Sequence, residues 1–455
     1  MSKEKKKSDL TGGQKIGMLL AAITAAIATG YIPNFINLYY TDTVGISIGA
    51  IGAILMASKI TDGVTDIIMG MILDRTKTRL GKARPWVLAG AAGLILTMMM
   101  LFHCPANLSN GWKIVYCTIF YFLANPFFGT MVSVSCGALP NLITSSSESR
   151  TVVGVFRSLG SLIPTILIGI LVPQMLAKMG ENQHTYTIVT GMFAIITAIC
   201  AVTAVVLIHE SVTERTAEVL TQKQPVGQSL KDLFTNKYFI FLALGTIAFN
   251  LTNVPVSTYY AKYIFHDVGK TTWISLPTIF MVLLLPVAIP LVNKIGKRAA
   301  MVGGLLTAAV GSIIIFFAND SLAVFMVGKT IASLGVVPYF CALVPVTGEI
   351  CDYALYKSGK PMDGTISSAA SMGEKIGIGL AAGLSSLLLQ VAGFRSSTAA
   401  ITVAQPDKAI MMIRILLGVY PAVLFVIAAV FFSLIDMKKE GIEDIQKELR
   451  EKHMR

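Results

Sequence analysis

The amino-acid sequence predicts an all-α membrane protein, with about twelve transmembrane helices arranged in two six-helix bundles. Composition is the first reason: 54% of the 455 residues are hydrophobic, only 14% are charged, and the mean hydropathy is +0.70. Soluble domains carry about 25% charged residues. The second reason is that the apolar residues fall in runs of about 20 or more, the length that a helix needs to cross a hydrocarbon core. The third is that runs such as VLAGAAGLILTMMMLF are apolar throughout, whereas barrel strands alternate apolar and polar residues.

The predicted spans follow one another with short polar connections between them. Each contains few charged residues and is long enough to cross a bilayer. Their ranges are 15–40, 48–74, 84–104, 112–140, 152–175, 185–209, 238–264, 271–294, 299–318, 322–346, 366–394 and 409–436.

The basic residues predict the orientation in the membrane. The formal net charge is +12, which in a soluble protein suggests nucleic acid, but here the positive charge gathers in every second connection. Because basic connections stay on the cytoplasmic side, we expect a multi-pass protein of the cell (plasma or inner) membrane with both termini cytoplasmic, and no nucleic-acid partner. The basic clusters are Lys3, Lys5, Lys6 and Lys7; Arg75, Lys77, Arg79, Lys82 and Arg84; Lys294, Lys297 and Arg298; and Lys438 and Lys439.

The six cysteines predict neither a disulfide framework nor a metal site. They show no CxxC or Cys/His spacing, and most sit inside apolar runs as small packing residues. Walker, GxGxxG and zinc-ligand spacings are also absent from the sequence, which disfavours an enzyme and an ATP-driven pump. We therefore expect no cofactor other than a coupling ion, and transport driven by the gradient of an ion or of the solute.

One long polar stretch divides the chain. Residues 210–237 separate an N-terminal six-helix bundle, 1–209, from a C-terminal one, 238–436, followed by a cytoplasmic tail, 437–455. The halves echo each other, since LGKARPWVLAG after the second span resembles IGKRAAMVGG after the eighth. Parallel repeats of this kind indicate a major-facilitator fold, in which the solute site lies between the halves near mid-membrane. One chain then contains both halves, and we expect a functional monomer.

The second span carries three ionisable residues, Lys59, Asp62 and Asp66. Spacings of three and four put them on one face of a helix. Two carboxylates one turn apart in a low dielectric repel each other strongly unless one is protonated or a cation lies between them. The pair therefore predicts a cation site. In the alternative interpretation Asp62 pairs with Lys59, Asp66 borders a water pocket and no ion is transported.

Further polar residues lie in spans four, five and eleven. Thr130 and Ser133 share a face of span four, although such hydroxyls often bond only their own helix backbone. Arg157 in span five and Lys375 in span eleven are the costliest residues of their helices. They either face the solute or serve in snorkelling or interhelical ion pairs.

The sequence resembles the glycoside–pentoside–hexuronide:cation symporter family of the major facilitator superfamily, to which the melibiose permease and the glucuronide carrier belong. The resemblance covers residues 12–440 and rests on YYTD, D-x-x-x-D followed by MG, DRTKTRLGKARPW, GALPNLIT with SESRT, DYALYKSGK and GEKIG. It implies that Asp62, Asp66 and Thr130 bind Na+ or H+, with the Thr65 hydroxyl where the melibiose-type pattern has an asparagine. It also places Arg157 and Lys375 beside the cation site and the sugar.

Three departures from the melibiose-type pattern bear on the solute. The first span lacks the sugar-binding aspartate, the second aspartate of span four is Ser133, and the stacking aromatic falls at Gly137. We therefore expect symport of a glycoside or sugar contacted by Arg157, Lys375, Ser133 and Lys59, with an anionic sugar such as a hexuronide as a candidate. A lipid or lysolipid transporter of the same fold is the main alternative, and a non-transporting sensor is a third.

Overall fold

The structure is a computed structural model that describes residues 10–144, 147–210, 237–358, 363–396, 404–436 and 441–451. Within these ranges the regular structure is helical, with no β-strand. Helices occupy all of the predicted span ranges, and ten of them are long and apolar enough to cross a membrane. The prediction of an all-α membrane protein is therefore confirmed. The predicted loop 210–237 lies almost wholly outside the described residues.

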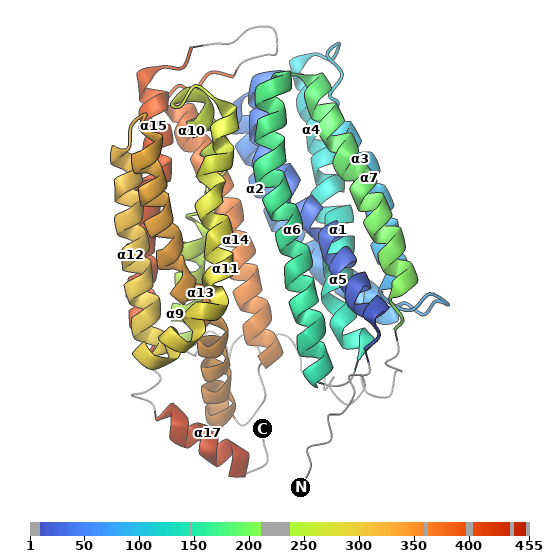
Figure 1. The fold of residues 1–455 in the computed structure, drawn as a ribbon, viewed down its shortest axis with the longest axis vertical. Helices are drawn as coiled ribbons and strands as arrows, with labels where there is room; N and C mark the ends of the chain where they lie inside the picture. Colours follow the sequence, from blue (N-terminus) through green and yellow to red (C-terminus); the bar gives the residue numbers. More distant parts are fainter. Residues whose placement is uncertain are drawn as a thin grey trace. The chain divides into compact units, whose positions relative to one another are not determined.

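The chain forms two compact units. The first contains the helices up to α7 together with a short segment at Arg395 and Ser396, where the Ser396 hydroxyl donates to the Ile46 carbonyl over 2.7 Å. Helix α1 begins with a capping box in which Thr11 and Gln14 satisfy each other's backbone N–H groups. The elements of this unit are α1 (Gly12–Leu38), the π-helical turn η1 (Tyr39–Val44), α2 (Ile48–Arg75), α3 (Arg84–Leu101), α4 (Asn110–Phe122), the π-helical turn η2 (Leu123–Gly129), α5 (Thr130–Ile143), α6 (Ser147–Met179) and α7 (Gln183–Leu207) (Figure 1).

The second unit contains α9 to α17. Two spans predicted as continuous are interrupted here. The range 238–264 breaks after Asn250, just before Pro255, and the range 409–436 breaks at Gly418, just before Pro421; proline removes a backbone donor, and glycine adds backbone freedom. The elements are α9 (Lys237–Asn250), α10 (Ser257–Tyr263), η5 (Val268–Lys270), α11 (Thr271–Ile295), α12 (Lys297–Phe317), α13 (Leu322–Ser358), α14 (Asp363–Val391), α15 (Asp407–Leu417), α16 (Val419–Ser433) and α17 (Ile442–Glu451).

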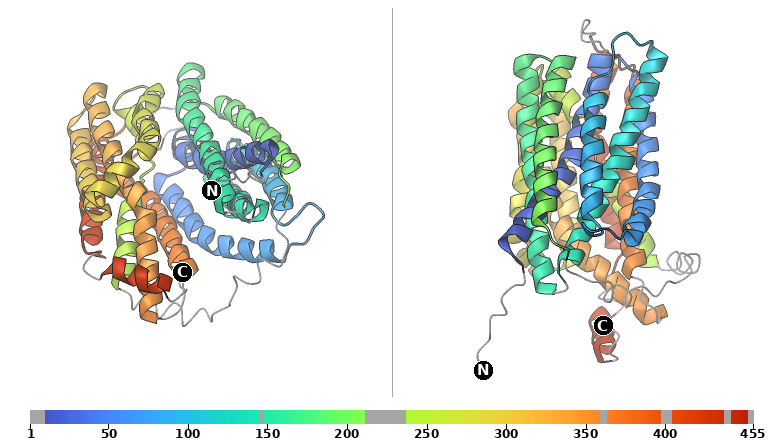
Figure 2. Two further views of the ribbon diagram at one scale, coloured as in Figure 1. Left: turned by 60° about the horizontal axis from the view of Figure 1, so that its bottom comes forward. Right: turned by 90° about the vertical axis from the view of Figure 1, so that its right-hand side faces the viewer.

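Helix α17 lies in the stretch predicted as a tail. It is amphipathic, and Ile442, Ile445 and Leu449 are buried against the hydrophobic core of the second unit. These residues are spaced by three and four, so they form one stripe on the helix. Figure 2 shows α17, in red, at the end of the bundle from two further directions. The end of the chain is thus partly an ordered helix packed on α13.

The start of α3 is held to the end of α7 by Glu210. Its carboxylate accepts the backbone N–H groups of Lys82, Ala83 and Arg84 over 2.6, 3.0 and 3.0 Å. The Arg84 side chain donates to the Val205 carbonyl near the end of α7 over 2.9 Å. A carboxylate at a helix N-terminus meets unpaired N–H donors and the positive end of the helix dipole. The basic loop is therefore fixed to the sixth span of its own half.

The second unit repeats this arrangement at the start of α12. Arg298 contacts Asp436 over 2.8 Å and donates to the Ser433 carbonyl at the end of α16. Lys297 pairs with Glu349 of α13 over 2.5 Å. The resemblance between LGKARPW and IGKRAA thus corresponds to similar contacts. In each half an arginine side chain at the start of the third span donates to a carbonyl near the end of the sixth. The acid beyond the sixth span accepts backbone N–H groups in the first half and pairs with the arginine side chain in the second.

Helices α12 and α13 approach each other closely through glycines. A Cβ built on Gly311 would lie 2.6 Å from the Gly328 carbonyl oxygen, and one on Gly335 would lie 2.5 Å from the Ala308 nitrogen. Small residues allow such backbone approach between membrane helices, whose association depends on packing because lipid is as apolar as the side chains. This interface therefore tolerates no added side chain without separation of the helices.

We predict that Gly311→Ala lowers the stability of the protein by about 1–3 kcal/mol, because its methyl group meets backbone rather than a movable side chain. The matched control is Gly303→Ala on the same helix, where no atom lies within 4 Å of the new Cβ. Thermal unfolding of the purified protein in detergent measures the difference. Equal unfolding temperatures for the two variants would contradict the packing argument.

Candidate functional site

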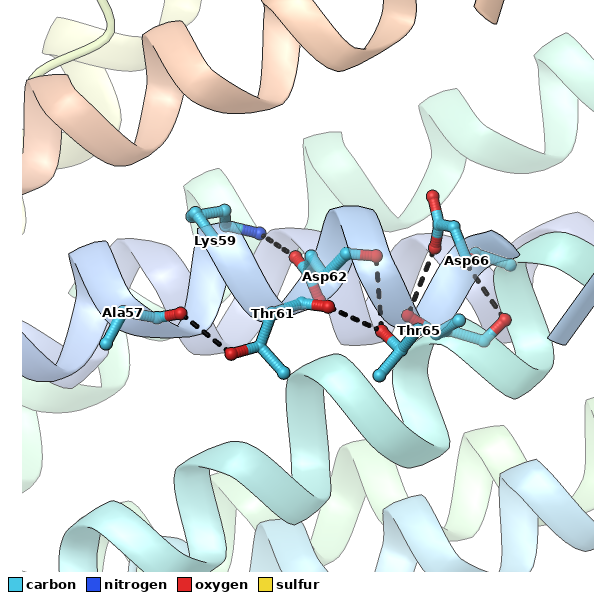
Figure 3. A network of polar contacts seen from close by, with 8 residues as sticks. Ala57, Lys59, Thr61, Asp62, Thr65 and Asp66 are labelled. Carbon is cyan, nitrogen blue, oxygen red and sulfur yellow. Dashed lines mark hydrogen bonds and ion pairs between the residues drawn. The ribbon is translucent and has the colours of Figure 1, made fainter. Parts of the chain in front are cut away.

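Helix α2 places the three ionisable residues of the predicted cation site inside the first unit. The Lys59 Nζ atom lies 2.7 Å from Asp62 Oδ2, one turn away, and both side chains are largely buried. Figure 3 shows this ion pair and Asp66 further along the same helix. The pairing expected in the alternative interpretation is thus present. One lysine neutralises one carboxylate, however, so the pair leaves the charge of Asp66 to other partners.

Thr130 connects Asp66 to the neighbouring span. Its hydroxyl donates to Asp66 Oδ1 over 3.2 Å, and Thr130 itself is only 4% exposed. Thr130 is the first residue of α5, directly after η2, where Pro126 lies inside the helix. Since proline lacks an N–H and disturbs the regular ladder, it accounts for the wider π-turn. The structure therefore brings Asp62, Asp66 and Thr130 together on facing helices.

The other two predicted hydroxyls bond to their own helices. Thr65 donates to the carbonyls of Thr61 and Asp62 over 3.1 Å each (Figure 3). Ser133 donates to the Thr130 carbonyl over 3.3 Å. These bonds use the hydroxyl hydrogens, and the oxygen lone pairs remain for a cation or a solute hydroxyl.

Arg157 lies on α6, beside Gly137 of α5, the position where the melibiose-type pattern has an aromatic residue. A Cβ built on Gly137 would lie 3.9 Å from the Arg157 Nη2 atom, and no other atom is within 4 Å. The arginine side chain is exposed. Gly137 follows Ser133 by one turn of α5. The guanidinium group of Arg157, which belongs to α6, therefore lies beside α5 at a point further along that helix than Thr130 and Ser133. The structure thus places the Arg157 guanidinium group beside α5 of the first unit.

Lys375 belongs to α14 of the second unit. Gly373 and Gly377 on either side of it pack against α9, since Cβ atoms there would lie 3.5 Å from Ile247 and 2.7 Å from Asn250. At about 100° per residue, Lys375 projects from the side of α14 away from α9. It is partly buried and has contacts of its own.

Three buried polar residues near Asp62 were not identified from the sequence. Tyr121 of α4 lies close enough to Asp62 to interact with it electrostatically, and it contacts Asn125 one turn further on. Ser58 lies one turn before Asp62 on α2, and both Ser58 and Asn125 are buried. An amide directly before a proline inside an apolar span was the available signal for Asn125, and no signal in the sequence distinguished Ser58 or Tyr121.

The chemistry of this cluster suits a hard cation. Carboxylate, hydroxyl and amide oxygens are the ligands that alkali and alkaline-earth ions prefer. In the described part of the chain, no group of three or more His, Cys, Asp and Glu side chains is placed to hold a metal ion. A cation bound here would therefore depend on neutral oxygens beside the two carboxylates.

Sequence comparison shows relatives over the whole length of the chain. An isoprimeverose transporter of Lactiplantibacillus pentosus is 25% identical over 97% of this chain and 92% of its own length. A glucuronide carrier protein homolog of Escherichia coli is 24% identical over 94% of each chain. A putative sulfoquinovose importer of Salmonella typhimurium is 27% identical over 91% of this chain and 86% of its own.

Solved structures share the fold. A D-xylose-proton symporter matches with a TM-score of 0.65 and 13% identity over 93% of this chain and 97% of its own. A bacterial homologue of the lysosomal transporter Spinster, inward-facing and occupied, matches with a TM-score of 0.68 and 14% identity over 92% and 96%. The family model described as MFS/sugar transport protein matches residues 16–439. The chain therefore belongs to the MFS/sugar transport protein family and is a multi-pass membrane transporter.

Proposed function

We propose that this protein is a secondary active transporter that couples uptake of a glycoside or other sugar to Na+ or H+ by alternating access. The observation that carries the proposal is the pair of aspartates on α2, a helix apolar enough to cross a membrane. Asp62 pairs with Lys59 of the same helix, and Asp66 accepts a hydrogen bond from Thr130 of α5. Ionisable groups at that depth are costly and persist where they serve an ion or solute pathway. In this proposal Asp62, Asp66, Thr65 and Thr130 bind the cation.

The relatives support a sugar as the solute. Their names refer to isoprimeverose, glucuronide and sulfoquinovose, which are a neutral disaccharide, a sugar acid conjugate and a sulfonated sugar. The Spinster homologue, at 14% identity, shows the fold alone. A sugar or glycoside is therefore the preferred solute class, with Arg157, Lys375, Ser133 and Lys59 as its proposed contacts.

The proposed orientation follows from the basic loops. We place both termini, the loop at residues 75–84 and the connection at 210–237 in the cytoplasm. We also propose that one chain is the complete transport unit, because both halves of the fold lie on one polypeptide. A thermal-shift screen of neutral and acidic sugars, with and without Na+, tests the function, because a bound ligand raises the unfolding temperature.

The first prediction from this proposal concerns coupling. Asp66→Asn should abolish gradient-driven accumulation, because the amide can still accept from Thr130 but no longer carries the charge that binds a cation. Asp62→Asn should do the same and also release Lys59. Uptake by proteoliposomes under an imposed Na+ or H+ gradient is the measurement, and Asp320→Asn, an exposed acid outside the spans, is the control. Full accumulation by both span variants would remove the assignment.

The second prediction concerns the solute. Arginine holds a carboxylate or sulfonate through two parallel hydrogen bonds, so a sugar acid should be preferred over its uncharged analogue by at least about tenfold, or about 1.4 kcal/mol. Methyl β-D-glucuronide and methyl β-D-glucoside form a suitable competing pair. Arg157→Gln should reduce binding mainly of the acid, whereas the exposed control Lys408→Gln should change neither. Equal competition by both sugars in the wild type would exclude an anionic preference and leave symport standing.

The third prediction concerns orientation. A cysteine at Arg79, in the loop between α2 and α3, should react with a membrane-impermeant thiol reagent only after the cells are opened. A cysteine at Asn107, in the connection between α3 and α4 at the other end of the same unit, should react in intact cells. Five of the six native cysteines are buried, so their background should be low. The reverse labelling pattern would invert the orientation.

A further inference from the structure

Two cysteines of the first unit lie next to each other in the structure. Cys104 belongs to the connection between α3 and α4, and Cys117 lies on α4. Their thiols are close enough to hydrogen-bond to each other, and the two residues are only 2% and 0% exposed. Both are free thiols in this structure. The proposed transport mechanism uses neither of them, and their spacing in the sequence gave no sign that they meet.

The end of the first span holds both cysteines by their backbones. The Tyr39 hydroxyl accepts the Cys104 backbone N–H over 3.0 Å, and the Tyr40 hydroxyl donates to the Cys117 carbonyl over 3.4 Å. Tyr39 and Tyr40 are consecutive residues of η1, and both are fully buried. One π-turn therefore fixes the two cysteines relative to each other.

A third tyrosine joins the residues that precede the two cysteines. The Tyr116 hydroxyl lies 2.9 Å from the Met100 carbonyl oxygen and 3.3 Å from that of His103. Tyr116 comes directly before Cys117, and His103 directly before Cys104. A disulfide requires a specific separation and direction of the two side chains. Because Cys104 lies in a non-helical connection, its backbone can adjust to that geometry more easily than a residue within a helix.

The chemistry of the pair and its place in the membrane suit oxidation. The connection between α3 and α4 lies at the opposite end of α3 from the basic loop 75–84, so the proposed orientation places it outside the cytoplasm, where disulfides persist. The hydrogen bond from Cys117 lowers the pKa of the Cys104 thiol against the effect of burial, and the Lys113 ammonium group acts in the same direction as Cys117. Since the thiolate is the nucleophile in disulfide exchange, Cys104 is the cysteine that reacts first.

We propose that Cys104 and Cys117 are joined by a disulfide at the outer end of spans three and four, formed by exchange with a disulfide of the external medium or envelope. The Cys104 thiolate attacks one sulfur of that disulfide and releases one thiol. Cys117 then loses its proton and attacks the Cys104 sulfur, which releases the second thiol. The two cysteine protons pass to the released sulfurs, the cysteines are oxidised and the external disulfide is reduced.

The bond goes beyond the proposed transport and rests only on the proposed orientation. Because both thiols are almost fully buried, the exchange takes place before α4 has packed against η1. The closed loop runs from residue 104 to residue 117, and such a loop removes freedom from the unfolded chain. The disulfide would therefore stabilise the outer end of the first unit, where spans one, three and four meet.

Reverse thiol labelling of the full-length protein in its own membranes tests the proposal. Free thiols are blocked with N-ethylmaleimide in SDS as the cells are lysed, disulfides are then reduced, and the new thiols are labelled with a maleimide-polyethylene glycol that shifts the band on an immunoblot. The wild type should take up two labels. Cys104→Ala and Cys117→Ala should take up none. The matched control Cys200→Ala, another buried cysteine of the same unit, should still take up two.

Each other outcome contradicts the proposal. A wild type that takes up no label has only free thiols, and the contact is then an ordinary hydrogen bond between buried side chains. Two labels on either Cys104→Ala or Cys117→Ala would assign the bond to other cysteines. Labelling is done on unfolded protein, so a variant that folds poorly still gives a result. The cysteines introduced at Arg79 and Asn107 test the orientation separately, so an unlabelled wild type with the expected orientation overturns this inference alone and leaves the proposed transport standing.

Discussion

The arrangement of the first unit depends on the cost of keeping ionised carboxylates inside an apolar helix. Asp62 and Asp66 lie one turn apart on α2, where neither lipid nor apolar side chains can solvate a charge. Each is therefore held by a specific partner, Asp62 by Lys59 on its own helix and Asp66 by Thr130 on the next span. Lys59 can neutralise only one of the two carboxylates, so the charge of the other depends on groups outside α2.

The backbone of the membrane helices is modified where the polar groups lie. A transmembrane helix must pair its own backbone groups, so irregular turns occur only where neighbouring helices compensate for them. The π-turn η2 is such a case: it contains Pro126 and ends at Thr130, whose side chain meets Asp66. The same turn contains the buried Asn125. In the second unit, α12 and α13 pack through glycines at backbone distance.

The two halves share a device at their basic loops. In the first unit Glu210 and Val205 fix the start of α3, and in the second Asp436 and Ser433 fix the start of α12. In both cases a residue just beyond the sixth span of a half contacts the beginning of its third. Rigid halves are a requirement of alternating access, in which one bundle moves against the other around a fixed site. These contacts support each half as one body.

The sequence by itself determined the fold class and the residues that carry charge. Long apolar runs have few structural solutions in lipid, so helices and their ranges follow from composition and length. The same reasoning identified Asp62, Asp66, Arg157 and Lys375, since an ionisable residue in such a run stands out against its neighbours. The breaks near Pro255 and Gly418 were missed, because the apolar pattern continues through them.

Only the tertiary structure decided which groups meet. The contact of Thr130 with Asp66 depends on the packing of two helices and on a π-turn whose register the sequence pattern does not specify. Asn125 and Ser58 are ordinary polar residues in the sequence, and only the packing of the helices shows that both are buried. Burial and pairing are properties of several helices at once, whereas apolar periodicity is a property of one, and for this reason the spans were predictable and the contact between Thr130 and Asp66 was not.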